Sequence, residues 1–185
     1  MNWMTSLEAR WTRTDHPAVI FGDEVVTYGA LSARLARARG WLEARGVGCG
    51  DGIALQMPRG LAFLELHLAA LSIGAWTLPL NPSYTRREVS FALTDASPSI
   101  AVLPEGSEPE ADVRVVSARD VRAELDAATP APPIEVPGST LACLCYTSGT
   151  TGIPKGARIS HDNLAFTVRA PVSYTHLTLP TICSV

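Results

Sequence analysis

The residues best suited to chemistry lie near the end of the chain, in the segment TSGTTGIPKG at positions 147–156. Its glycines allow backbone N–H groups to face an anion without a side chain in the way, and its hydroxyl groups add donors. Its one ammonium group adds charge, and a hydrogen bond to a charged group is worth about 1.5–3 kcal/mol. This composition predicts a loop that holds the phosphates of a nucleotide. The candidate binding residues are Thr147, Ser148, Gly149, Thr150, Thr151, Gly152 and Lys155.

Lys155 is unusual in this chain. Of the 15 basic residues it is the only lysine, and the other 14 are arginines. Composition alone leaves a second interpretation open, because surface loops rich in Ser, Thr and Gly are common.

Two familiar nucleotide-binding templates do not fit the sequence. The spacing of Gly149, Gly152 and Lys155 does not match G-x-x-x-x-G-K-[ST], which disfavours a Walker-type NTPase. The glycine-rich segment GVGCGDG at 46–52 does not match G-x-G-x-x-G, and it follows an expected helix. We therefore expect a helix-to-strand turn at 46–52.

The candidate loop follows a sequence in which short apolar runs alternate with helical periodicity. This alternation predicts an α/β fold with a mostly parallel sheet flanked by helices. We expect Thr27 and Ser160 to cap helices, residues 85–88 to form a capping box, and His67 and His161 to be structural. The expected strands are 18–21, 25–28, 53–57, 76–80, 99–103, 113–116 and 140–146, and the expected helices include 31–42, 61–73 and 117–125.

We predict four segments. Residues 1–126 form an N-terminal α/β subdomain, and 127–139, which hold four prolines, form a stiff exposed connection. Residues 140–170 begin the nucleotide-binding part. Residues 171–185, PVSYTHLTLPTICSV, contain no Ala, Gly or charged residue and resemble translated adapter sequence, so we expect a non-native tail, with a genuine short strand as the alternative.

Charge, hydropathy and cysteine content argue against several classes of function and of binding site. A net charge of −3 without a basic run gives no surface for nucleic acid. No apolar run approaches the roughly 20 residues of a membrane span, and no signal peptide is evident, so we expect a cytoplasmic protein. The four cysteines show no metal-ligand spacing, so we predict no metal site and reduced thiols.

The string YTSGTTGIPKG at 146–156 closely resembles the signature loop of the adenylate-forming (AMP-binding) enzymes: acyl-CoA synthetases, adenylation domains of non-ribosomal peptide synthetases, and firefly luciferase. Three upstream stretches resemble family elements in the same order: VTYGAL at 26–31, GVGCGDGIAL at 46–55 and LSIGAWTLPLNP at 71–82. The resemblance covers about residues 15–170. Asn81, and SGTTG in place of SGSTG, are more similar to the acyl-CoA synthetase type.

The resemblance implies a ligase that acts in two steps. A small-molecule carboxylic acid attacks ATP to give an acyl-adenylate and pyrophosphate, and a thiol, usually that of coenzyme A, then displaces AMP. The seven loop residues named above would hold the β- and γ-phosphates together with Mg²⁺. The resemblance also implies a role in fatty acid metabolism. Two alternative functions remain: an adenylation domain that loads a carrier protein, and a nucleotide-binding module without catalysis.

Family members are about three times longer than this chain. The segments that in the family stack adenine, bind the ribose and supply the catalytic lysine follow the loop helix and do not occur in these 185 residues. We therefore assign no catalytic residue and expect the fragment alone to be inactive.

Overall fold

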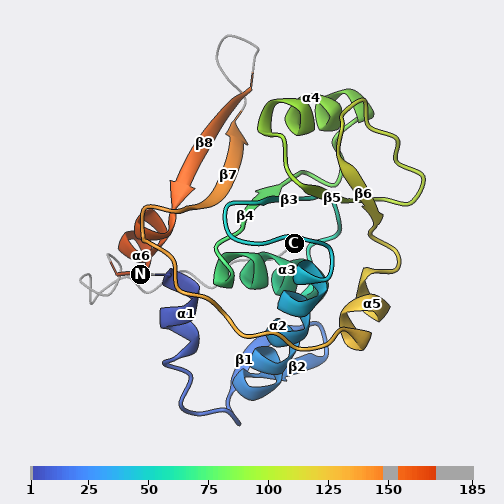
Figure 1. The fold of residues 1–185 in the computed structure, drawn as a ribbon. Helices are drawn as coiled ribbons and strands as arrows, with labels where there is room; N and C mark the ends of the chain where they lie inside the picture. The colour runs from blue at the N-terminus through green and yellow to red at the C-terminus, as the bar shows by residue number, and fades with distance from the viewer. Residues whose placement is uncertain (1, 148–153, 170–185) are drawn as a thin grey trace.

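A six-stranded sheet is the centre of the computed structural model, which describes residues 2–147 and 154–169 (Figure 1). Its strands lie in the order β6-β5-β3-β4-β7-β8. Neighbouring strands are parallel except β7 and β8, which are antiparallel. The strands are β3 Gly52–Leu55, β4 Trp76–Pro79, β5 Ile100–Leu103, β6 Arg114–Ser117, β7 Leu141–Thr147 and β8 Lys155–Ser160. The predicted α/β class with a mostly parallel sheet is confirmed.

Helices cover both faces of the sheet. The helices α2 Tyr28–Glu43, α3 Leu61–Ser72 and α5 Val121–Ala127 lie on one face, and α4 Arg86–Ala96 lies on the other (Figure 1). The helix α1 Trp3–Glu8 packs beside α3 and α6 His161–Arg169. A separate antiparallel pair consists of β1 Pro17–Phe21 and β2 Glu24–Thr27.

Local capping explains where two helices begin. The Thr27 hydroxyl accepts a hydrogen bond from the Ala30 N–H at 3.2 Å at the start of α2. At α4 the Thr85 N–H donates to Glu88 at 2.7 Å and the Glu88 N–H donates to Thr85 Oγ1 at 3.4 Å, a complete capping box. The Thr85 N–H and, after it, the Thr85 hydroxyl donate to the Glu88 carboxylate and lower its pKa. Both caps confirm the sequence-based predictions.

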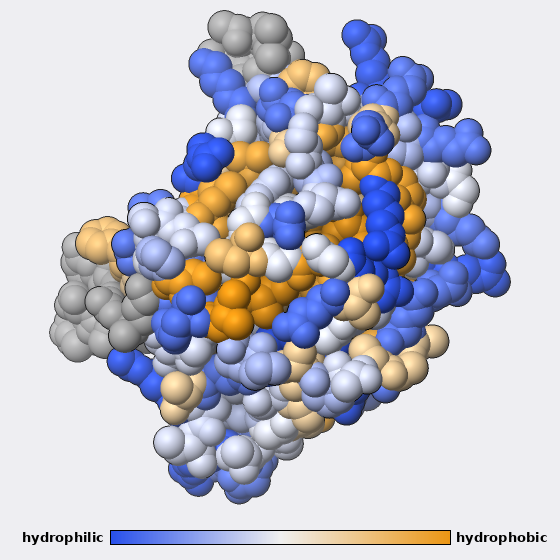
Figure 2. All heavy atoms as spheres, in the orientation of Figure 1, coloured by the Kyte–Doolittle hydropathy of each residue, from blue (hydrophilic) through white to orange (hydrophobic). Residues whose placement is uncertain are grey.

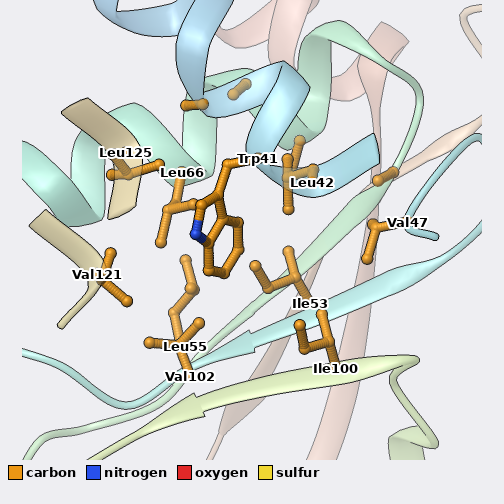
Figure 3. Packing of buried hydrophobic residues seen from close by; sticks show 14 of the residues in the cluster. Trp41, Leu42, Val47, Ile53, Leu55, Leu66, Ile100, Val102, Val121 and Leu125 are labelled. Atoms are coloured by element: carbon orange, nitrogen blue, oxygen red, sulfur yellow. The ribbon is translucent and has the colours of Figure 1, made fainter. Parts of the chain in front are cut away.

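The main core lies between the sheet and the three helices on its first face. Figure 3 shows the Trp41 indole of α2 among Leu66 of α3 and Ile53 and Leu55 of β3. The indole N–H donates to Glu124 at 2.9 Å, so the polar edge of this large buried ring is satisfied. This packing positions β3, which pairs with β4, and β4 in turn pairs with β7.

A buried carboxylate links the three helices on this face. Glu65 of α3 has no exposed side-chain surface, and its oxygens lie 2.8 Å from Arg122 of α5 and 3.3 Å from Arg34 of α2. The outer side of Arg122 pairs with the exposed Asp126 at 2.6 Å. A buried charge needs this compensation, because it has lost its contact with water.

The segment 127–139 is not exposed throughout, in contrast to the expectation from its prolines. Ala131 and Val136 are buried, and the Ala131 N–H donates to the Ala36 carbonyl of α2 at 2.9 Å. The buried Arg39 donates from Nε to the Ala131 carbonyl at 2.8 Å. Prolines cannot donate backbone hydrogen bonds, so the segment is held instead at its other residues.

Other expectations were wrong at particular boundaries. Residues 147, 155 and 156, predicted as loop, lie in β7 and β8 because the two strands pair as far as Thr147 and Lys155. The helix expected from residue 117 begins at Val121, since Ser117 still pairs with Leu103 in the sheet. The helix α1 was not predicted, and Asn2 caps it by accepting from the Met4 N–H at 3.0 Å.

None of the helices in the described part of the chain has the length and apolar character that crossing a bilayer requires.

We predict that Glu65→Ala lowers the free energy of unfolding by about 1–3 kcal/mol, because it removes the buried anion shared by Arg34 and Arg122 and leaves each with one more exposed carboxylate, Glu24 or Asp126. The measurement is urea-induced unfolding followed by circular dichroism. The matched control Asp126→Ala removes only the exposed partner of Arg122 and should cost less than about 0.5 kcal/mol. Equal effects of the two changes would contradict the importance of the buried contact.

We also predict that Gly40→Ala destabilises the protein by about 1–3 kcal/mol through overpacking. A Cβ at position 40 would overlap the Thr129 carbonyl, which is backbone and cannot rotate away. Helix propensity alone predicts the opposite sign, a gain of about 1 kcal/mol. The control Ala33→Gly, at an exposed position of the same helix, measures that propensity directly. A more stable Gly40→Ala variant would show that the 127–139 segment is not held against α2.

Candidate functional site

The site begins where β7 and β8 reach their shared outer end. Thr147 and Lys155 are directly paired across the two antiparallel strands, and Thr147 Oγ1 lies 3.5 Å from the Lys155 carbonyl oxygen. Both residues are exposed, and the pair lies at the end of the two strands that extend from the body of the molecule (Figure 1). Directly paired residues share one face of a sheet, so the hydroxyl group and the ammonium group face the same side.

The structure thus describes two of the seven predicted phosphate-binding residues and brings them together. The other five lie outside the described residues: Ser148, Gly149, Thr150, Thr151 and Gly152. The phosphate-binding role of all seven therefore stays a prediction.

The two faces of β7 differ in chemistry. Cys143 pairs with Thr77 of β4, which contacts His67 of α3. Cys143, Cys145 and Thr147 therefore lie on the face toward α3, with Lys155 beside Thr147. Leu144 and Tyr146 lie on the face toward α4, because side chains alternate along a strand. A register irregularity between Leu141 and Cys143 marks the point where this regular alternation begins.

A polar contact joins α3 to β4 beside the α3 face of β7. His67 Nδ1 of α3 lies 2.9 Å from Thr77 Oγ1 of β4, and Thr77 is paired with Cys143 of β7. The His67 ring also stacks on Phe63, with ring centroids 6.1 Å apart. Burial, and after it the nearby Arg59, lower the pKa of His67 to about 4, so the imidazole is neutral near pH 7. His67 is therefore a hydrogen-bonded core residue, as predicted.

On the α4 side the structure has a cleft of about 470 Å³. Its lining includes Trp76, Asp95, Tyr146 and Arg158, and the Tyr146 hydroxyl donates to the Asp95 carboxylate. Burial and the neighbouring carboxylate raise the pKa of the Tyr146 hydroxyl, so it stays protonated. Figure 2 shows apolar surface along β7 and beneath α4 in this view. No local pattern in the sequence indicates this cleft, because α4 and β7 are distant in the chain.

The inner end of β8 is fixed to the body of the protein. Ser160 caps α6 by accepting from the Asn163 N–H at 3.2 Å, and the Ser160 N–H donates to Asn163 Oδ1 at 3.0 Å. His161 is fully buried, its Nδ1 accepts from the Trp3 N–H at 3.3 Å, and burial lowers its pKa. Both residues have the structural roles predicted for them. The outer end of β8 is thus supported from a fixed base.

In the ranges 2–147 and 154–169 no group of three or more His, Cys, Asp or Glu side chains has the arrangement of a metal site. We therefore assign no described residue as a ligand of Mg²⁺.

The chain matches the family described as AMP-binding enzyme over residues 7–182. It is 40% identical over 152 residues to a feruloyl-CoA synthase from an Amycolatopsis species, covering 80% of this chain and 31% of that protein. It is 36% identical over 153 residues to CymA from Salinispora arenicola strain CNS-205, a probable non-canonical nonribosomal peptide synthetase, covering 83% of this chain and 2% of that protein.

Among solved structures, ATP-bound MatB from Rhodopseudomonas palustris superimposes with a TM-score of 0.83. The sequences are 32% identical, and the match covers 94% of this chain and 37% of MatB. The chain therefore spans about a third or less of the length of these relatives.

The low pKa of His67 predicts a pH dependence of stability. The unfolded chain, in which the pKa is about 6.5, binds a proton more readily than the folded chain, so stability rises with pH between about 4 and 6.5. The contribution of His67 is fully present above about pH 6.5 and is lost as the pH falls toward 4, by about 3 kcal/mol in total. Unfolding free energies measured from pH 4 to 7.5 should show this slope. His67→Gln should reduce it, and an unchanged slope in that variant would contradict the assignment.

Proposed function

The chain belongs to the AMP-binding enzyme family, and from this premise we propose that it is part of an ATP-dependent ligase of the acyl-CoA synthetase type. The proposed reaction joins a small carboxylic acid to AMP with release of pyrophosphate, and coenzyme A then takes the acyl group as a thioester. Because the chain spans only 31% of its feruloyl-CoA synthase relative, this activity is proposed for the whole protein.

The pairing of Thr147 with Lys155 is the observation that supports this proposal most. The two residues border the segment SGTTGIP, and their side chains lie on one face at the exposed end of β7 and β8. A hydroxyl donor and a fixed positive charge at this position suit the β- and γ-phosphates of ATP. The MatB structure that this chain resembles is bound to ATP.

The proposed work of these residues is to position the triphosphate and to balance its charge. With the outer phosphates held by Thr147, Lys155 and the intervening amides, the α-phosphate stays in place while the carboxylate attacks it. Pyrophosphate then leaves from the same residues, which can stabilise the charge that it gains. Mg²⁺ would share this neutralisation when it is bound with the nucleotide.

Two features favour coenzyme A as the acceptor. One is the sequence itself: Asn81 followed by Pro82, and SGTTG in the loop, both resemble the motifs of acyl-CoA synthetases. The other is the relation to feruloyl-CoA synthase at 40% identity. In the structure Asn81 stabilises the turn after β4, because its Oδ1 accepts from the Ser83 N–H at 3.0 Å.

The relation to the peptide synthetase CymA, at 36% identity, supports a second candidate function. In that case the acyl group passes to the phosphopantetheine thiol of a carrier protein. Incubation of the complete protein with ATP, a panel of carboxylic acids and either coenzyme A or a carrier protein with a free phosphopantetheine thiol distinguishes the two candidate functions. Thioester formed only on the carrier would exclude the first candidate.

In the complete protein, Lys155→Ala should lower carboxylate-dependent exchange of pyrophosphate into ATP at least tenfold, because the loss of a charged hydrogen bond is worth about 1.5–3 kcal/mol. The matched control is Arg87→Ala, which removes an equal charge from an exposed position of α4 outside the cleft. That control should retain near-normal exchange. Unchanged exchange in Lys155→Ala, or an equal loss in both variants, would contradict the proposed site.

A further inference from the structure

Two cysteines on β7 lie closer together than their places in the sequence require. The Sγ atoms of Cys143 and Cys145 are 3.4 Å apart, and both side chains lie on the face toward α3. Cys143 is 6% exposed, whereas Cys145 is half-buried. The pair therefore consists of an inner thiol and an outer thiol, and the outer one can be reached from solvent.

The residues paired with the two cysteines on the neighbouring strands are neutral. Across β8, Cys145 faces Ala157 and Cys143 faces Ile159, and across β4 Cys143 faces Thr77. The described residues add no third sulfur, imidazole or carboxylate in a metal-binding arrangement. Burial raises the pKa of Cys143 to about 12, so the inner sulfur is a neutral thiol near pH 7. Two thiols without oxygen ligands favour a soft, thiophilic element over a hard cation.

A direct disulfide fits this geometry poorly. Residues i and i+2 of a strand lie about 6.6 Å apart at Cα, near the upper limit of about 6.8 Å for a disulfide. Their Cβ atoms point the same way and stay about as far apart, beyond the usual limit of about 4.5 Å. Closing the S–S bond would therefore bend β7, whereas one bridging atom between the sulfurs would not.

The S···S distance of the two free thiols can be compared with what a bridging atom needs. With bonds to sulfur of about 2.3 Å, sulfurs 3.4 Å apart give an angle of about 95° at the bridging atom. This angle is smaller than the tetrahedral value of about 109° that zinc prefers, and far from a linear arrangement. A pyramidal element with bond angles near a right angle fits best, and trivalent arsenic has this geometry.

We propose that Cys143 and Cys145 form a two-thiol binding site for trivalent arsenicals. With a monosubstituted arsenic oxide, each S–H bond is replaced by an S–As bond, and the oxygen leaves as water with the two thiol protons. Arsenic remains trivalent and both sulfurs keep their oxidation state, so the reaction needs no oxidant or reductant. The product is a ring that contains the arsenic atom, the two sulfurs and the backbone that joins Cys143 to Cys145.

The test uses phenylarsine oxide and the 185-residue chain carrying C49S and C183S, which retains only this pair of cysteines. Intact-mass measurement should show the mass of one phenylarsine oxide gained, less the mass of one water. The adduct should survive excess monothiol, should be released by a dithiol, and should protect both cysteines from alkylation.

Single changes C143S and C145S in the same chain should each abolish the monothiol-resistant adduct. Circular dichroism must show a folded variant in each case, and C145S, at the half-buried position, is the safer of the two. A chain with only C49S and C183S that loses the arsenical to monothiol would overturn the proposal. So would a resistant adduct that persists in C145S.

One consequence rests on the proposed function. Thr147 lies two residues beyond Cys145 on the same face, so the bound phenylarsenic group should lower pyrophosphate exchange in the complete protein several-fold. The two assignments can fail separately, because adduct formation is read by mass. A confirmed adduct with undiminished exchange would contradict the role of this face in catalysis and leave the two-thiol site intact, whereas loss of the adduct would overturn the two-thiol site alone.

Discussion

The antiparallel pairing of β7 with β8 is the constraint on which the candidate site depends. A parallel strand must return through a long crossover, whereas an antiparallel neighbour can follow directly and place its first residue opposite the last residue before the turn. Here that arrangement sets Thr147 opposite Lys155. The one lysine of the chain is therefore held by backbone hydrogen bonds of the sheet, at a fixed distance from a hydroxyl group.

This pairing is useful only because both strands are anchored. On one side β7 pairs with β4, whose Thr77 contacts His67 of α3 and whose Leu78 lies in the core toward α4. On the other side β8 runs into α6, where the buried His161 contacts the backbone of α1. The buried contacts of Glu65 with Arg34 and Arg122 hold α2, α3 and α5 together beneath the sheet. Rigid support at the base and exposure at the tip are what a binding site for a charged ligand requires.

Strand β7 gives different chemistry to its two faces. On one face the polar residues Thr147 and Lys155 are followed inward by two neighbouring thiols. On the other face Tyr146 and Asp95 contribute to a cleft that is partly apolar. The strand alternation that exposes a hydroxyl group on one side thus presents an aromatic ring on the other.

Local signals in the sequence determined much of this protein. The alternation of strands and helices, the caps at Thr27, Thr85 and Ser160, and the candidate loop residues follow from short-range spacing, because hydrogen bonds within a turn or helix end depend on neighbours only. The family resemblance also rests on contiguous motifs. Tertiary structure alone decided that β7 and β8 extend to Thr147 and Lys155, that the proline-rich segment packs on α2, and that Asp95 meets Tyr146. These contacts join residues far apart in the chain, and their free energy comes from packing and pairing between elements, which no local pattern encodes.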